Sequence, residues 1–175
     1  YRNLFTLNAN TRIDGSNKFG SRSNEKLLPV WSVSGSYNIS EHAQMDNVWI
    51  SNLALRLSYG YQGNMLSGQS PEMIIKKLPF NSHYNELEAK VNVYPNPNLR
   101  WERTSSFNSG LDFALFNNAV QLNVSYYYKH TKDAFLNKRI SSVNGQKEYV
   151  INSGTINNQG WSIDATISPI SNENF

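Results

Sequence analysis

Apolar and polar residues alternate along most of this chain, and this period of two limits the possible folds more than any other feature. Between residues 52 and 62 every second position is apolar or aromatic, namely Leu53, Leu55, Leu57, Tyr59 and Tyr61. Because successive side chains of a β-strand point to opposite sides, such a strand has one apolar and one mainly polar face. This dyad pattern is typical of a membrane-spanning β-barrel wall, with lipid on one face and water on the other.

The same pattern recurs along the chain and predicts a fold of the all-β class: an antiparallel transmembrane β-barrel segment of about six strands. The strands are expected near residues 1–13, 30–39, 52–62, 101–116, 119–139 and 147–169. Their apolar positions are expected to face lipid, at Phe5, Leu7, Val33, Leu55, Leu57, Leu111, Leu122, Val124 and Ile163.

The connections between these strands alternate in length. Residues 40–51 and the two-residue turn Asn117-Asn118 are short connections, whereas 14–29, 63–100 and 131–159 are long. Outer-membrane barrels have short periplasmic turns and longer extracellular loops, so the first strand is predicted to run outward. Aromatic residues lie at a similar height above the short turns and predict one interfacial girdle: Trp31, Tyr61, Phe107, Tyr128 and Trp161.

Composition excludes several other classes of protein. The chain has no run of some 18 apolar residues that could form a transmembrane helix, and it has no cysteine for disulfides or thiolate metal sites. The net charge of +3 is scattered, without the basic stripe of a nucleic-acid-binding protein. We find no catalytic motif and no metal-ligand spacing, so we predict no enzyme, no catalytic residue, no cofactor and no metal. A targeting segment is expected to lie outside this sequence.

Several strings, taken in order, resemble a known family. They include TRIDGSNKFG (11–20), NPNLRWERTSSFNSGLDFALFNN (96–118) and NSGTINNQGWSIDATI (152–167), with further matching strings at 31–40, 52–64 and 126–133. The ordered set closely resembles the barrel of the SusC/RagA family, the TonB-linked (TonB-dependent) outer-membrane transporters of Bacteroidetes.

This resemblance implies a nutrient importer in the outer membrane of a Gram-negative bacterium. Plugged barrels of this type have about 22 strands, so residues 1–175 would form a partial barrel domain, about a quarter of the wall. The plug domain and the remaining strands would lie outside this chain. The implied partners are a SusD-like surface lipoprotein, TonB through the absent N-terminal part, a glycan or peptide solute, and outer-membrane lipid.

Charged residues on the polar positions predict one specific contact. Arg56 and Asp112 lie on strands joined by a single long connection, at similar heights above their short turns, so we predict a lumenal ion pair. The alternative is that each side chain contacts the plug instead. His130, Lys132 and Asp133 are expected on a hydrated rim where the fifth strand leaves the membrane.

The connection 63–100 is predicted to be a functional surface, because loops of such length usually carry function or are disordered. It contains apolar and aromatic residues that a purely solvated loop has little use for. We expect the segment to pack over the barrel mouth and to form a partner or solute surface with Met73, Ile74, Ile75, Phe80, Tyr84 and Tyr94. One alternative is a small core within the loop itself. Another, for the whole chain, is a soluble β-rich carbohydrate-binding or adhesive module.

Overall fold

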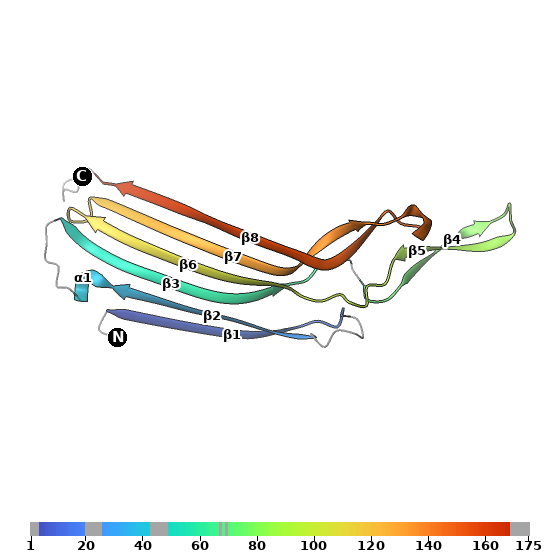
Figure 1. The fold of residues 1–175 in the computed structure, drawn as a ribbon, viewed down its shortest axis with the longest axis horizontal. Helices are drawn as coiled ribbons and strands as arrows, with labels where there is room; N and C mark the ends of the chain where they lie inside the picture. The colour runs from blue at the N-terminus through green and yellow to red at the C-terminus, as the bar shows by residue number, and fades with distance from the viewer. Residues whose placement is uncertain (1–3, 20–25, 43–48, 67, 69, 169–175) are drawn as a thin grey trace.

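The computed structural model describes residues 4–19, 26–42, 49–66, 68 and 70–168, which fold into two antiparallel sheets (Figure 1). The large sheet has the strand order β1-β2-β3-β6-β7-β8. Its strands are β1 (Phe5–Gly15), β2 (Leu27–Asn38), β3 (Ile50–Asn64), β6 (Glu102–Leu115), β7 (Val120–Arg139) and β8 (Glu148–Ile167). Each pairs antiparallel with its neighbours, so the predicted strands are confirmed, with their ends shifted by a few residues.

The turn between β6 and β7 differs from the predicted two-residue hairpin. Leu115 pairs with Val120, so residues 116–119 form the loop. Three of its residues have positive φ angles: Phe116 at 53°, Asn117 at 53° and Asn118 at 68°. Asparagine tolerates this left-handed conformation well, whereas a bulky residue adopts it rarely. Phe116 is held by its N–H, which donates to the Trp49 carbonyl at 3.3 Å, and by the Trp49 ring at 5.4 Å.

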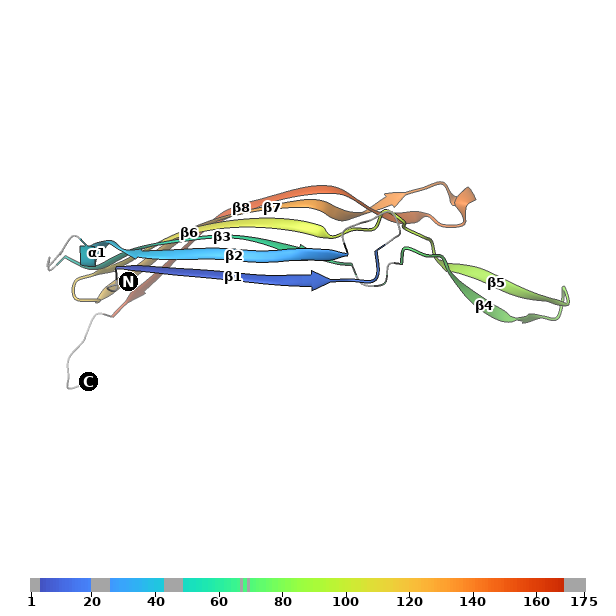
Figure 2. The same ribbon diagram turned by 90° about the horizontal axis from the view of Figure 1, so that it is seen from below.

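Figure 2 shows the large sheet as a single layer. The register gives its two faces different chemistry. One register row crosses the apolar face through Phe5, Tyr37, Leu55, Leu111, Val124 and Ile163. The next row, on the opposite face, consists of Thr6, Ser36, Arg56, Gly110, Ser125 and Ser162. All the residues predicted to face lipid lie on the apolar face, exposed or half-buried, and none of them lies in a protein core.

Aromatic rings gather on the apolar face toward the long connections. The register pairs Trp31 with Tyr61 and Phe107 with Tyr128. Trp161 pairs with Tyr126, and their ring centroids are 4.8 Å apart. These pairs occupy successive rows of one face rather than a single row. In a barrel the strands are tilted, so residues at one depth in the membrane lie on successive register rows of neighbouring strands. The arrangement of these rings therefore fits the predicted girdle.

The connection 63–100 holds an element that was not predicted from the sequence. β4 (Ile74–Asn81) and β5 (Glu86–Val93) form an antiparallel hairpin, which we call the arm. The arm continues beyond the long-connection end of β1 and β2 in both views (Figures 1 and 2). The ends of β7 and β8 that flank the short 3-10 helix η1 (Ser142–Asn144) also extend beyond β1 and β2. We call η1 and these strand ends, residues 134–139 and 148–154, the tower.

A small apolar cluster lies where the arm and the tower leave the sheet. It consists of Phe19, Leu28, Leu99 and Trp101, with Val30, Tyr61, Met65 and Phe135 packed against it. At the opposite end of the sheet, the one-turn helix α1 (Ile39–His42) follows β2 within the predicted short connection. Among the described residues, no helix is long and apolar enough to cross a membrane.

Candidate functional site

The polar face is lined by short side chains around Arg56. They border a depression of about 480 Å³ and include Asn8, Ser34, Ser36, Ser58, Asn108, Gly110, Asn123 and Ser125. Gly110 lies directly opposite Arg56 in the register, and a Cβ atom added there would lie 3.7 Å from the Arg56 Nη2 atom. The guanidinium group therefore lies over the bare backbone of β6, within reach of the next polar row.

Arg56 and Asp112 are joined by two bonds. Arg56 Nε lies 2.6 Å from Asp112 Oδ2, and Arg56 Nη2 donates to Asp112 Oδ1 at 2.7 Å. The Asn123 amide also donates to Asp112 Oδ1. The pair spans the strands diagonally, because Asp112 is the register partner of Ala54. The two side chains are 53% and 34% exposed, so water screens the pair and its stabilisation is at most about 1 kcal/mol.

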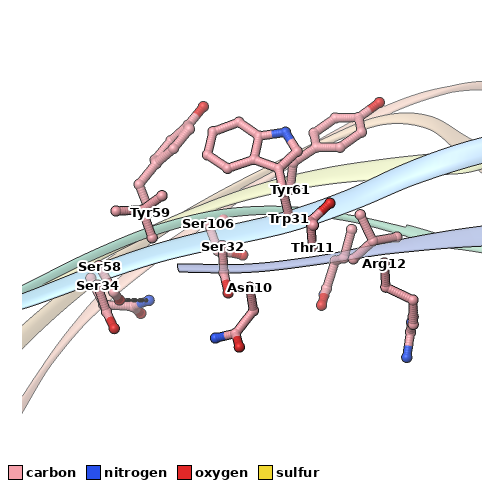
Figure 3. A pocket seen from close by; sticks show the side chains of 15 residues that line it. Asn10, Thr11, Arg12, Trp31, Ser32, Ser34, Ser58, Tyr59, Tyr61 and Ser106 are labelled. Carbon is pink, nitrogen blue, oxygen red and sulfur yellow. Dashed lines mark hydrogen bonds between the residues drawn. The ribbon is translucent and has the colours of Figure 1, made fainter. Parts of the chain in front are cut away.

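A second depression, of about 690 Å³, adjoins β1, β2 and β3 (Figure 3). Its lining comes from both faces of the sheet. The rings of Trp31, Tyr59 and Tyr61 point to one side, whereas Asn10, Arg12, Ser34 and Ser58 point to the other. Residues on opposite faces of one layer cannot enclose a single ligand. This region therefore displays the two-sided wall rather than a closed binding site.

The best-connected polar cluster lies at the base of the tower, and we call it the clamp. The Asp133 carboxylate is 12% exposed, and Oδ1 lies 2.6 Å from Arg100 Nη2. Oδ2 accepts a bond from Arg103 Nε at 3.1 Å and another from Arg103 Nη2. Asn152 completes the clamp, because its amide donates to the carbonyl groups of Arg100 at 2.9 Å and Asp133 at 3.0 Å. The prediction that Asp133 lies on a hydrated rim is therefore wrong.

The position of Asp133 depends on an irregularity in β7. The register shifts between Lys132 and Ala134, and Asp133 has a φ of 57°. A β-bulge of this kind redirects the side chain of its extra residue. Here that side chain points at Arg100, at the end of the connection that carries the arm, and at Arg103 of β6. No sequence pattern marks this bulge, so the clamp was not predicted.

Two further bonds tie the segment after the arm to the tower. The Tyr149 hydroxyl donates to the Pro95 carbonyl at 2.7 Å, and the Asn96 amide donates to the Val150 carbonyl at 2.9 Å. Burial raises the pKa of Tyr149 above its ordinary value of 10.0, which extends the pH range over which its hydroxyl can donate. Asn96 N also donates to Ser70 O at 3.1 Å, which brings the two ends of the arm together.

The arm itself has two different faces. Ile75 pairs with Val91 and Phe80 pairs with Leu87, which places these four residues on one apolar face with Ala89. Ile75, Phe80 and Leu87 are 58%, 54% and 82% exposed. Met73, Ile74 and Tyr84 are exposed too, whereas Tyr94 is half-buried. The alternative of a small core within this loop is therefore wrong for the apolar residues of the arm.

An aromatic pair at the short-connection end also escaped the sequence analysis. Trp49 and Phe116 are exposed and in contact, at the opposite end of the wall from the predicted girdle. The sequence did offer a signal for this pair, because each of the two aromatic residues lies beside a short connection. Among the described residues, no group of histidine and acidic side chains could hold a metal ion.

Comparison with known proteins decides the family. The family described as TonB dependent receptor-like, beta-barrel matches residues 3–172. This chain belongs to that family. TonB-dependent receptors are transporters rather than enzymes, and they reside in the outer membrane of Gram-negative bacteria. The resemblance to the barrel of TonB-dependent outer-membrane transporters expected from the sequence is thereby confirmed.

Individual relatives match over the whole chain. TonB-dependent receptor P26 of Formosa agariphila is 28% identical over 178 residues, which cover 100% of this chain and 18% of the receptor. TonB-dependent receptor SusC of Bacteroides thetaiotaomicron is 28% identical over 185 residues, which cover 99% of this chain and 18% of SusC. The chain thus spans less than a fifth of the length of these receptors.

Solved structures of the RagAB peptide importer match as well. The closed-closed state matches with a TM-score of 0.84 at 26% identity, covering 97% of this chain and 18% of the matched chain. The open-open state matches with a TM-score of 0.76 over 93% of this chain. A TonB-dependent receptor wall also explains the uncovered apolar face of the sheet. The alternative of a soluble module does not, because such a module would bury that face.

Proposed function

We propose that this chain is part of the wall of a nutrient importer that takes up a glycan or a peptide together with a SusD-like surface lipoprotein. The observation that carries the proposal is the pair of chemically opposite register rows, apolar on one face and hydroxyl-rich on the other, in a chain that matches this family from end to end. The apolar rows face lipid, and the polar rows line the lumen. The plug and the segment that contacts TonB lie in the rest of the protein.

The long-connection end is extracellular in this proposal, because outer-membrane barrels carry their longer loops there. The arm and the tower then stand above the membrane. Above the girdle, the apolar-face positions of β7 are taken by His130 and Lys132, as expected for a strand that has left the lipid. We place the polar pair of Arg56 and Asp112 in the lumen, where it stiffens the wall or meets the plug.

The arm is proposed as part of the interface with the lipoprotein. An isolated two-stranded hairpin is marginally stable in water, and here its apolar face is uncovered. Exposed apolar patches of this kind mark interaction sites. By the family resemblance, the lipoprotein covers the barrel mouth as a hinged lid, which brings it to the end of the wall where the arm stands.

The test is deletion of residues 71–94 in the complete transporter. The hydrogen bond between Asn96 N and Ser70 O holds the two ends together, so the cut can close without disturbing β3 or β6. Heat-modifiable gel mobility first shows that the barrel assembles normally. Capture of the lipoprotein and uptake of solute are then compared with wild type, and both are expected to fall at least about tenfold.

A second variant separates contact from spacing. The triple substitution Ile75→Thr, Phe80→Thr and Leu87→Thr keeps the length of the arm and removes its apolar face. It should weaken lipoprotein capture nearly as much as the deletion does. Wild-type capture and uptake in both variants would refute a role of the arm in the interface.

A further inference from the structure

The charged face of the arm carries two lysines in direct opposition. Lys76 of β4 is the register partner of Lys90 of β5, so both side chains project from the same face, and both are exposed. Like charges directly opposite each other destabilise an antiparallel pair. The arm has only two strands and little stability to spare, so this arrangement needs an explanation.

The lysines form no ion pair with a neighbouring carboxylate of the described residues. Among the residues that the structure describes, neither lysine takes part in an ion pair or a hydrogen bond. Glu88 shares their face, but its Oε1 accepts a bond from Asn81 Nδ2 at 2.5 Å, toward the tip of the hairpin. Neither ammonium group is therefore paired with a carboxylate of the described residues.

We propose that Lys76 and Lys90 together bind a carboxylate on the surface of the lipoprotein that covers the barrel mouth. This inference rests on the proposed function and adds the chemistry of the partner, which must present an acidic side chain to this face of the arm. Two flexible ammonium groups on adjacent strands can contact the same carboxylate, one on each oxygen. Bound in this way, the carboxylate removes the repulsion that the free arm carries.

Lys77 provides a matched control. It is the next residue along β4, it is also exposed, and its register partner is Ala89, so it projects from the opposite, apolar face. Lys77→Glu makes the same change of charge at almost the same place in the protein. Only the face of the hairpin differs.

The charge reversals also separate docking from stability. Lys76→Glu or Lys90→Glu, made singly, sets opposite charges across the two strands and should stabilise the arm itself. A merely structural role of the pair therefore predicts unchanged or improved lipoprotein binding. A carboxylate-binding role predicts the reverse, because each substitution repels the incoming acidic group.

The experiment measures binding of the purified full-length transporter variants to the lipoprotein at several salt concentrations. We expect Lys76→Glu and Lys90→Glu each to weaken binding about tenfold at low salt, with a smaller loss at high salt, and Lys77→Glu to stay within about twofold of wild type. Equal losses for all three variants, or none for Lys76→Glu and Lys90→Glu, would overturn the proposal.

The arm deletion distinguishes a failure of the lysine proposal from a failure of the proposed interface between the arm and the lipoprotein. If the deletion abolishes lipoprotein binding but Lys76→Glu does not weaken it, the lysine proposal fails and the interface remains. If the deletion has no effect either, the interface itself fails. If the lysine variants bind the lipoprotein normally but lose uptake of an acidic solute, the site serves the solute, and the proposal is again overturned.

Discussion

Neutralising Asp133 should release the segment between the arm and β6, which the clamp ties to the tower. Asp133→Asn is the informative substitution, because asparagine adopts the left-handed conformation of this residue, at a φ of 57°, as readily as aspartate does. The backbone bulge is then preserved while the charge is lost. Two arginines would face each other across a neutral amide.

The expected cost follows from the contacts of the carboxylate. Hydrogen bonds to charged groups contribute about 1.5–3 kcal/mol each when they are well shielded. Asp133 is 12% exposed, but Arg100 and Arg103 are 41% and 32% exposed, so solvent screening reduces the total. We expect local opening to become easier by about 2 kcal/mol, which corresponds to about a 30-fold larger open population.

Hydrogen exchange on the full-length transporter in detergent measures this opening. The Arg100 N–H donates to Asn152 Oδ1 at 3.2 Å and the Leu99 N–H donates to Asn96 O at 3.1 Å, so both amides are protected by the clamped geometry. Their exchange should accelerate about 30-fold in Asp133→Asn, in line with the estimated opening. The control is Asp14→Asn, which breaks the exposed pair of Asp14 with Arg12 at 2.7 Å and should leave these amides unchanged. Unaltered exchange of these amides in Asp133→Asn would refute the idea that the clamp holds this segment closed.

Three further predictions concern single contacts. A Cβ added at Gly160 would lie 2.8 Å from the Tyr127 ring, so Gly160→Ala should displace the ring and lower the heat-modification temperature of the barrel. Adding Tyr127→Ala to this variant should restore that temperature. Gly35→Ala is the control and should be neutral, because the nearest atom to a Cβ added there is 3.6 Å away. Arg56→Gln should cost at most about 1 kcal/mol in the same assay, because the pair is half exposed, and a much larger loss would indicate contact with the plug. Tyr149→Phe removes the bond to the Pro95 carbonyl and should lower the free energy of local opening at the end of the arm, measured by hydrogen exchange, by about 1 kcal/mol. The pKa of Tyr149 is raised in the folded state, so its contribution should persist below about pH 10 and disappear as the pH rises past the folded value, in the wild type alone.

The wall could be predicted from the sequence because one local rule governs it. In a strand between lipid and water, the polarity of each residue indicates which face of the sheet it lies on. Leu55 and Val124 can therefore be assigned to the lipid-facing side without knowledge of any distant contact. The short turns then fix the heights, which is why Arg56 and Asp112 could be placed near each other. Their diagonal offset could not be predicted, because the alternation of apolar and polar residues does not fix which residue of β6 lies opposite Arg56.

The arm and the clamp escaped prediction for two different physical reasons. In β4, whose register shifts between Ile74 and Ile75 and between Lys77 and Phe80, apolar and polar residues do not alternate. β5 does alternate, so it left a signal, but a single short strand without an alternating partner did not mark a hairpin. In the clamp, Arg100 and Asp133 are far apart in the sequence and meet because β7 bulges at Asp133 itself. Contacts that depend on an irregular backbone leave no periodic trace in a single sequence.

The closed base of the arm has a consequence for how such transporters diversify. Because the backbones of Ser70 and Asn96 are hydrogen-bonded to each other, whatever is inserted between them enters and leaves the wall at one point. Residues 71–94 can lengthen, shorten or change their chemistry while the pairing of β3 with β6 keeps its register. The proposed docking surface can therefore change its chemistry while the strands of the wall keep their residues and their pairing.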